Sequence, residues 1–130
     1  MLFAAHSGLR FLVLLAGFFV VLYALVGLLG KREYSPVMAR LAAAFTGLLH
    51  LQVLTGIAVL FTRTFYTAIV GHLFLTLAAA AVAQFTGSVM KRRPREQKSY
   101  GPHLVGTALA LGLVAAGVMA IGRGVLQSTM

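Results

Sequence analysis

The chain contains no cysteine, no aspartate and no tryptophan, and its only acidic residues are Glu33 and Glu96. The missing cysteine excludes disulfides within the chain, iron–sulfur clusters, thiolate zinc sites and covalently attached haem. With two carboxylates, the sequence also lacks the material for a carboxylate calcium site or for the paired acids of a glycosidase. The chemistry that remains open depends on histidine, arginine and the neutral polar side chains.

Charged residues of either sign are scarce, at 10% of 130 residues, whereas hydrophobic residues make up 60% and the mean hydropathy is +0.95. This composition is far more apolar than that of a soluble domain. A membrane crossing takes roughly 20 apolar residues, so the length allows four spans with short loops and no separate soluble catalytic domain. The sequence therefore predicts one all-α integral membrane domain over residues 1–130. We place its spans at residues 3–30, 37–62, 65–90 and 102–123.

The net charge of +9 comes from basic residues that are confined to the segments between apolar runs. This placement favours membrane topology over nucleic-acid binding. The first and third connections hold eight Lys and Arg residues, and the opposite side holds three. Because cytoplasmic loops retain positive charge, we expect both termini on the non-cytoplasmic side. The short connection around Arg63 makes the second and third spans an antiparallel hairpin, and the whole chain an up-down-up-down bundle. No basic region precedes the first apolar stretch, so we expect a retained helix there and not a cleaved signal peptide.

The four histidines are distributed one per predicted span, at His6, His50, His72 and His103. An ionisable group inside a membrane span is costly and indicates a functional site. Neutral imidazole is a common ligand of haem iron, and two histidines from different helices hold a b-type haem without any cysteine. The structural alternative is that each imidazole hydrogen-bonds a neighbouring carbonyl or lies at the membrane interface.

The depth of each histidine in its span indicates which two could share one haem. His6 and His72 both lie in the outer part of their spans, which are diagonal in a simple four-helix bundle, so they form the best-matched axial pair. His50 lies near the middle of the second span, and a pairing of His50 with His72 stays open. His103 opens the fourth span at the inner surface. Arg10 follows His6 by four residues and therefore shares its helical face, where it could pair with a haem propionate or snorkel to the interface.

Other polar residues in the spans are expected to hydrogen-bond between helices. Gln52 could in addition face a quinone or the edge of a haem. The remaining residues of this group are Thr46, Thr55, Thr76 and Gln84.

The segment His6-Ser7-Gly8-Leu9-Arg10-Phe11 resembles a family of small four-helix bacterial membrane proteins described as cytochrome b-like. The likeness extends through residues 30–34 and 50–56 and through Gly71-His72. What the resemblance implies is haem b binding and a redox function, with the first three histidines of the chain as the matching ones. It also implies a bacterial inner (cytoplasmic) membrane location. His103 has no match in the pattern.

These observations together predict a membrane b-type cytochrome with one haem b, or two, which exchanges single electrons with quinone or with a respiratory partner. An electron carrier or redox subunit is expected rather than a stand-alone enzyme. One alternative is a non-catalytic small subunit of a larger respiratory complex. Another is a copper-binding membrane protein that uses His6, His50 and His72, since imidazole also suits copper. The expected partners are the lipid bilayer and other membrane redox subunits or a second copy of the chain, with no nucleic acid.

Overall fold

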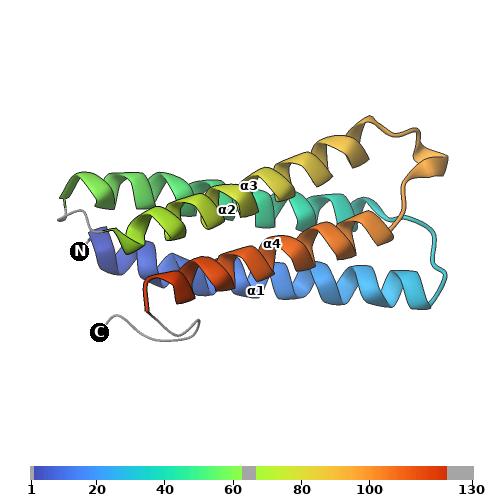
Figure 1. Ribbon diagram of the computed structural model, residues 1–130. Helices are drawn as coiled ribbons and strands as arrows, with labels where there is room; N and C mark the ends of the chain where they lie inside the picture. The colour runs from blue at the N-terminus through green and yellow to red at the C-terminus, as the bar shows by residue number, and fades with distance from the viewer. Residues whose placement is uncertain (1, 63–66, 123–130) are drawn as a thin grey trace.

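Four long helices make up almost all of the described chain. The computed structural model describes residues 2–62 and 67–122. Its elements, in chain order, are α1 (Leu2–Leu29), α2 (Pro36–Thr62), α3 (Ala68–Arg92), the short 3₁₀ helix η1 (Arg95–Gln97) and α4 (Gly101–Ala120) (Figure 1). Each of the four α-helices is long and apolar enough to cross a membrane. The prediction of an all-α four-helix membrane bundle is therefore confirmed.

The observed helix ends differ from the predicted spans by a few residues. The fourth helix ends at Ala120, before the predicted limit of 123, because Gly122 adopts a φ of 76° that interrupts the helix. The third helix continues to Arg92, two residues beyond its predicted end, since Lys91 and Arg92 are favourable at a helix C-terminus. The predicted start of the third span, at 65, and the predicted end of the fourth, at 123, lie outside the described residues.

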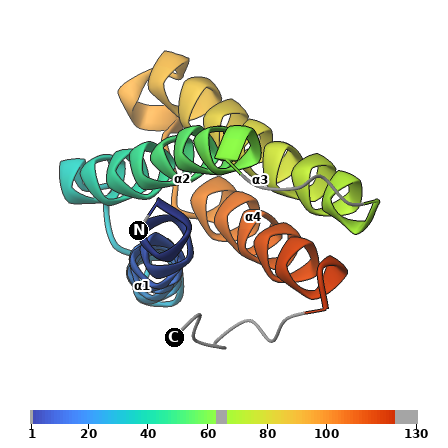
Figure 2. The same ribbon diagram turned by 90° about the vertical axis from the view of Figure 1, so that its left-hand side faces the viewer.

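The helices follow one another around the bundle, with α1 beside α2, α3 beside α4, and α1 diagonal to α3 (Figures 1 and 2). The packing is closest within the pairs α1/α2 and α3/α4, which form two layers. The connections 30–35 and 93–100 lie together at one end of the bundle, which we call the basic end. The opposite end, where α1 begins, α2 ends, α3 begins and α4 ends, is called the terminal end.

Small residues bring the helices of the bundle into close contact. The buried residues of α1 recur at intervals of three and four: Ser7, Arg10, Val13, Gly17, Val20, Ala24 and Gly27. The buried residues of α4 follow a similar spacing: His103, Gly106, Thr107, Ala110, Val114, Gly117 and Val118. Intervals of three and four residues keep one seam directed at the neighbouring helix, and small side chains in that seam let backbones approach. Large apolar side chains such as Phe61 and Phe74, which are 86% and 73% exposed, point outward, where lipid would solvate them.

Hydrogen bonds at the basic end join the α1–α2 connection to the start of α4. The buried Tyr100 hydroxyl donates to the carbonyl of Glu33 over 2.8 Å and accepts from the backbone N–H of Ser35 over 3.1 Å. The Tyr34 hydroxyl lies 2.7 Å from Nε2 of His103. Burial, and secondarily the neighbouring Tyr100, raises the pKa of the Tyr34 phenol, so this hydroxyl keeps its proton and can donate to the imidazole. These bonds fix the two layers to each other at this end.

Candidate functional site

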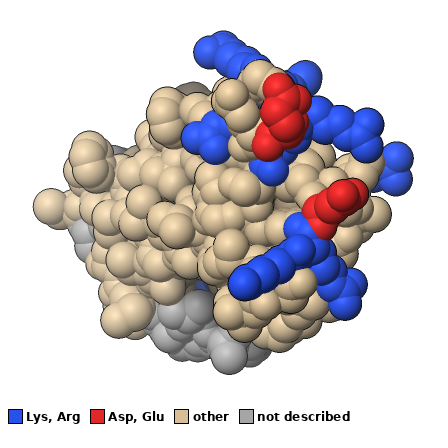
Figure 3. Space-filling view, turned by 90° about the vertical axis from the view of Figure 1, so that its right-hand side faces the viewer, with Lys and Arg blue, Asp and Glu red and all other residues tan. Residues whose placement is uncertain are grey.

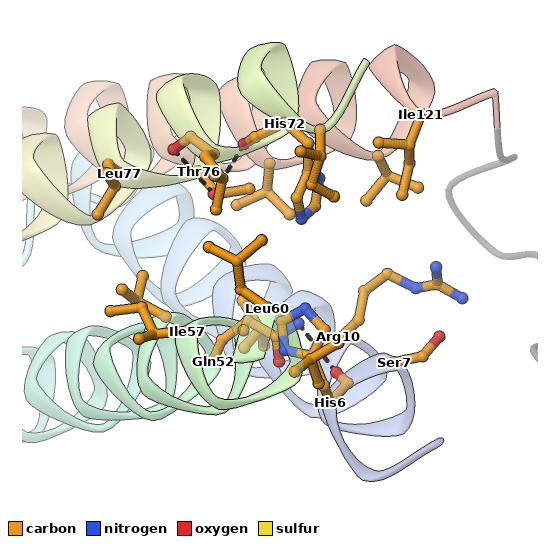
Figure 4. A pocket seen from close by; sticks show the side chains of 18 of the residues that line it. His6, Ser7, Arg10, Gln52, Ile57, Leu60, His72, Thr76, Leu77 and Ile121 are labelled. Carbon is orange, nitrogen blue, oxygen red and sulfur yellow. Dashed lines mark hydrogen bonds between the residues drawn. The ribbon is translucent and has the colours of Figure 1, made fainter. Parts of the chain in front are cut away.

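A cavity of about 220 Å³ lies between the two layers at the terminal end of the bundle (Figure 4). All four helices contribute to its wall, and most of the lining side chains are aliphatic. The polar residues that line it are His6, Ser7, Arg10, Gln52, His72 and Thr76. An apolar cavity with a few converging polar groups is the usual form of a cofactor site.

His6 of α1 and His72 of α3 face each other across this cavity, as their predicted depths and diagonal helices indicated (Figure 4). Their ring centroids are 6.4 Å apart and their planes cross at 87°. Two imidazoles bound to opposite sides of one metal ion, each through a bond of about 2 Å, have centroids roughly 6 Å apart. The separation of the two rings thus matches the axial pair of a six-coordinate metal.

Each of these two imidazoles is held through Nδ1 by an acceptor on the neighbouring helix of its own layer. Nδ1 of His72 lies 2.8 Å from the carbonyl oxygen of Gly117, which can only accept, so Nδ1 carries the proton. Nδ1 of His6 lies 2.9 Å from Oγ1 of Thr55. Because the Thr55 hydroxyl donates its own proton to the carbonyl of Gln52 over 3.0 Å, its oxygen accepts from His6. In both neutral rings the lone pair is then on Nε2.

This arrangement is the usual one around a metal-bound histidine, in which the distal ring nitrogen donates to a carbonyl or another oxygen and fixes the ring orientation. Further bonds support the backbone of the two histidines. The Gln52 amide donates to the carbonyl of His6 over 2.9 Å, and the Thr76 hydroxyl donates to the carbonyl of His72 over 2.8 Å. The two Nε2 lone pairs are therefore oriented by protein contacts before any ligand binds.

Gly56 lets α2 approach the His6 ring closely. A Cβ atom at this position would lie 2.9 Å from Cε1 of His6, closer than real Cβ contacts allow. Neither Gly56 nor Gly117 was predicted to be a site residue, and Thr55 was expected only to form a general interhelical hydrogen bond. The sequence feature that could have indicated them is the adjacent pair Thr55-Gly56, one helical turn after Gln52, which places a hydroxyl group beside a position without a side chain.

Arg10 lies in the wall of the same cavity and is only 4% exposed. Its guanidinium extends to one side of the histidine pair (Figure 4). The Cζ atom is 4.7 Å from the centroid of the Phe11 ring. The position of Arg10 four residues after His6 thus brings a buried cation to the same cavity as the histidine pair.

His50 and His103 are separated from this cavity. Both line a second cavity at the basic end, where His103 is buried and His50 is exposed. Among the described residues there is no group of three or more His, Cys, Asp or Glu side chains that could hold a metal ion. The structure therefore does not assemble the predicted copper set of His6, His50 and His72, nor does it pair His50 with His72, because His50 lies on a different face of α2.

Comparison of the chain with protein families, curated proteins and solved structures finds no match. The resemblance of the His6–Phe11 segment to cytochrome b-like proteins stays a prediction.

Proposed function

We propose that this chain is a membrane b-type cytochrome in which His6 and His72 are the axial ligands of one haem. The observation that carries the proposal is the pair of facing imidazoles, 6.4 Å apart, whose Nδ1 atoms are occupied by Thr55 and Gly117. Two free Nε2 atoms directed across an apolar cavity suit a low-spin iron and leave no position for a substrate on the metal. This favours electron transfer over catalysis at the iron.

When bound, haem would supply a one-electron couple, and the protein residues determine its surroundings. His6 and His72 would hold the iron from opposite layers. The aliphatic wall excludes water, and Arg10 offers a buried positive charge for a propionate. A buried cation beside a bound haem would favour its reduced state, which carries one positive charge fewer than the oxidised state.

The volume of the cavity indicates how a macrocycle would enter. At about 220 Å³ the cavity is smaller than the roughly 300–1,000 Å³ typical of pockets for drug-sized ligands. Binding therefore requires lining side chains such as Leu60 and Leu73 to change rotamer, or the two layers to separate at the terminal end. The layers pack less closely against each other than the helices within each layer, so separation there disturbs the fewest contacts.

The excess of Lys and Arg in the connections 30–35 and 93–100 and in the adjoining helix ends supports a cytoplasmic location for the basic end (Figure 3). The histidine pair would then lie toward the non-cytoplasmic surface of a bacterial inner membrane. From this depth the haem would exchange electrons with quinone in the bilayer or with a redox partner on that side.

The test compares three histidine variants of the purified protein, expressed with ample haem. The wild-type protein is expected to show a reducible absorption spectrum of a low-spin b-type haem. His6→Ala and His72→Ala should each lose the haem or convert it to a high-spin form, because water is scarce in the membrane interior and cannot replace the ligand. The matched control, His50→Ala, should keep the wild-type spectrum. A colourless wild-type protein, or haem that survives both His6→Ala and His72→Ala, would contradict the proposal.

A further inference from the structure

The second cavity, at the basic end, has a volume of about 640 Å³ and lies mainly between α2 and α3. It is distinct from the histidine-pair cavity, with which it shares no lining residue. Its volume falls within the range of roughly 300–1,000 Å³ found for ligand pockets. This cavity is therefore large enough for a ligand, and the proposed haem site makes no use of it.

Three cations from three different segments converge on the cavity: Arg40 from α2, Lys91 from α3 and Lys98 from the segment after η1. Neither Glu33 nor Glu96, the only acidic residues of the chain, lines it. At a membrane boundary, where the dielectric constant is low, several positive charges around one cavity repel one another and favour an anionic ligand. Figure 3 shows how strongly Lys and Arg dominate this end of the molecule.

Neutral polar side chains line the part of the cavity that is farther from the basic end along α2 and α3. Ser88 accepts a hydrogen bond from the Gln84 amide over 3.1 Å, so its own hydroxyl proton is available to a ligand oxygen. Thr46 and His50 also line this part. Three cations near the basic end, with neutral polar groups farther along the helices, match a molecule that has an anionic head and neutral ester oxygens behind it.

Glycines keep the cavity open toward the middle of the bundle. Gly47 and Gly87 both line it, and a Cβ atom at either position would meet no neighbouring atom within 4 Å. Ala39, Ala42 and Ala43 on α2 add further small side chains to the wall. The wall therefore has room for a flexible chain that runs from the cationic mouth along the helices.

We infer that this cavity binds an anionic phospholipid of the leaflet at the basic end. Arg40, Lys91 and Lys98 would contact the phosphate, and the neutral donors would contact the glycerol ester oxygens. Basic pockets between membrane helices are suited to such headgroups because the phosphate stays at the interface while the acyl chains stay in the hydrocarbon. A zwitterionic lipid would bring its own cation close to these three residues, so the cavity discriminates against it. This inference is independent of haem binding.

The experiment is native mass spectrometry of the detergent-purified protein after equilibration with phosphatidylglycerol, with phosphatidylcholine or with inorganic phosphate. We expect retained adducts of phosphatidylglycerol only. Retention of phosphatidylcholine to the same extent, or of inorganic phosphate as strongly as the lipid, would overturn the assignment to an anionic lipid. Circular dichroism verifies that the wild-type protein and each variant are folded.

Charge is tested with two double variants that remove the same number and type of cations. Arg40→Gln/Lys98→Gln changes two cavity residues, whereas Lys31→Gln/Arg95→Gln changes two residues that do not line the cavity. Both variants lose one charge from each connection region, so general attraction to anionic lipid is weakened equally. The cavity variant should bind phosphatidylglycerol about 30-fold more weakly than the control variant does. An equal loss in the two variants would show that the lipid is held by general surface charge and would overturn the proposal.

Space is tested with a glycine pair that leaves every charge in place. Gly87→Leu fills the cavity, while Gly112→Leu adds the same side chain at an exposed position of α4 outside it. We expect Gly87→Leu alone to lose the phosphatidylglycerol adduct. If Gly87→Leu retains the adduct as well as Gly112→Leu does, the lipid is not in this cavity. Since haem does not enter this measurement, a colourless protein leaves its outcome unchanged.

Discussion

Replacing Thr55 by valine tests whether the hydroxyl on α2 prepares His6 as an axial ligand. Valine keeps the shape of threonine but removes the oxygen that accepts from Nδ1 of His6 over 2.9 Å. Without haem, the His6 ring can rotate and form a hydrogen bond with another partner. If Nε2 were bound to iron, the ring orientation would be fixed and Nδ1 would point only toward position 55. The lost partner therefore weakens the bound state selectively. Removing one partner of a buried hydrogen bond costs about 1–3 kcal/mol, which corresponds to roughly a 5- to 150-fold weaker haem affinity.

The affinity is measured by titrating haem into haem-depleted protein and following the Soret absorbance. Thr62→Val is the matched control, because the Thr62 hydroxyl donates only to the carbonyl of Val59 in its own helix and is exposed. Thr55→Ser restores an acceptor and should recover most of the affinity. Equal affinities for Thr55→Val and Thr62→Val, or failure of Thr55→Ser to differ from Thr55→Val, would refute the role of this hydroxyl.

Two further predictions concern topology and packing. The chain has no cysteine, so a single introduced cysteine reports the location of its position. Because we place the basic end in the cytoplasm, Ser99→Cys should be protected from an impermeant thiol reagent in intact cells, and Thr67→Cys should be labelled. The reverse labelling pattern would show that the topology is inverted. Gly27→Ala should destabilise the bundle by about 1–3 kcal/mol in detergent unfolding, since its Cβ would lie 2.5 Å from the Tyr100 ring, which two hydrogen bonds hold in place. The control Gly8→Ala meets no neighbouring atom within 4 Å and should cost nothing, so equal losses would contradict this account.

The number, length and order of the helices could be predicted because lipid imposes a length and charge pattern that is visible in the sequence. The facing of His6 and His72 could be predicted for a related reason. At 1.5 Å per residue, distance from a span end gives depth, and the order of the helices around a bundle with short connections makes α1 and α3 diagonal. Depth and helix order suffice to bring two residues to the same region of the bundle.

The rotation of each helix could not be predicted, and this is why His50 was a candidate. Leu49 is 1% exposed, whereas His50, one residue further along α2, is exposed. In a helix of a soluble protein, the polar face identifies the side that is exposed to solvent. A membrane helix is apolar on all sides, so its sequence does not show which of the faces, about 100° apart from one residue to the next, is turned toward the other helices. The contacts of Thr55 and Gly56 with His6, and the cavity at the basic end, depend on that rotation and became visible only in the structure.

The hydrogen bonds at the two ends of the bundle join different pairs of helices. At the basic end, bonds from Tyr34 and Tyr100 join the two layers. At the terminal end, the bonds of His6 and His72 hold each ring to a helix of its own layer. A metal bound by both histidines would therefore connect α1 to α3, and so join the two layers directly at the end where the cavity lies.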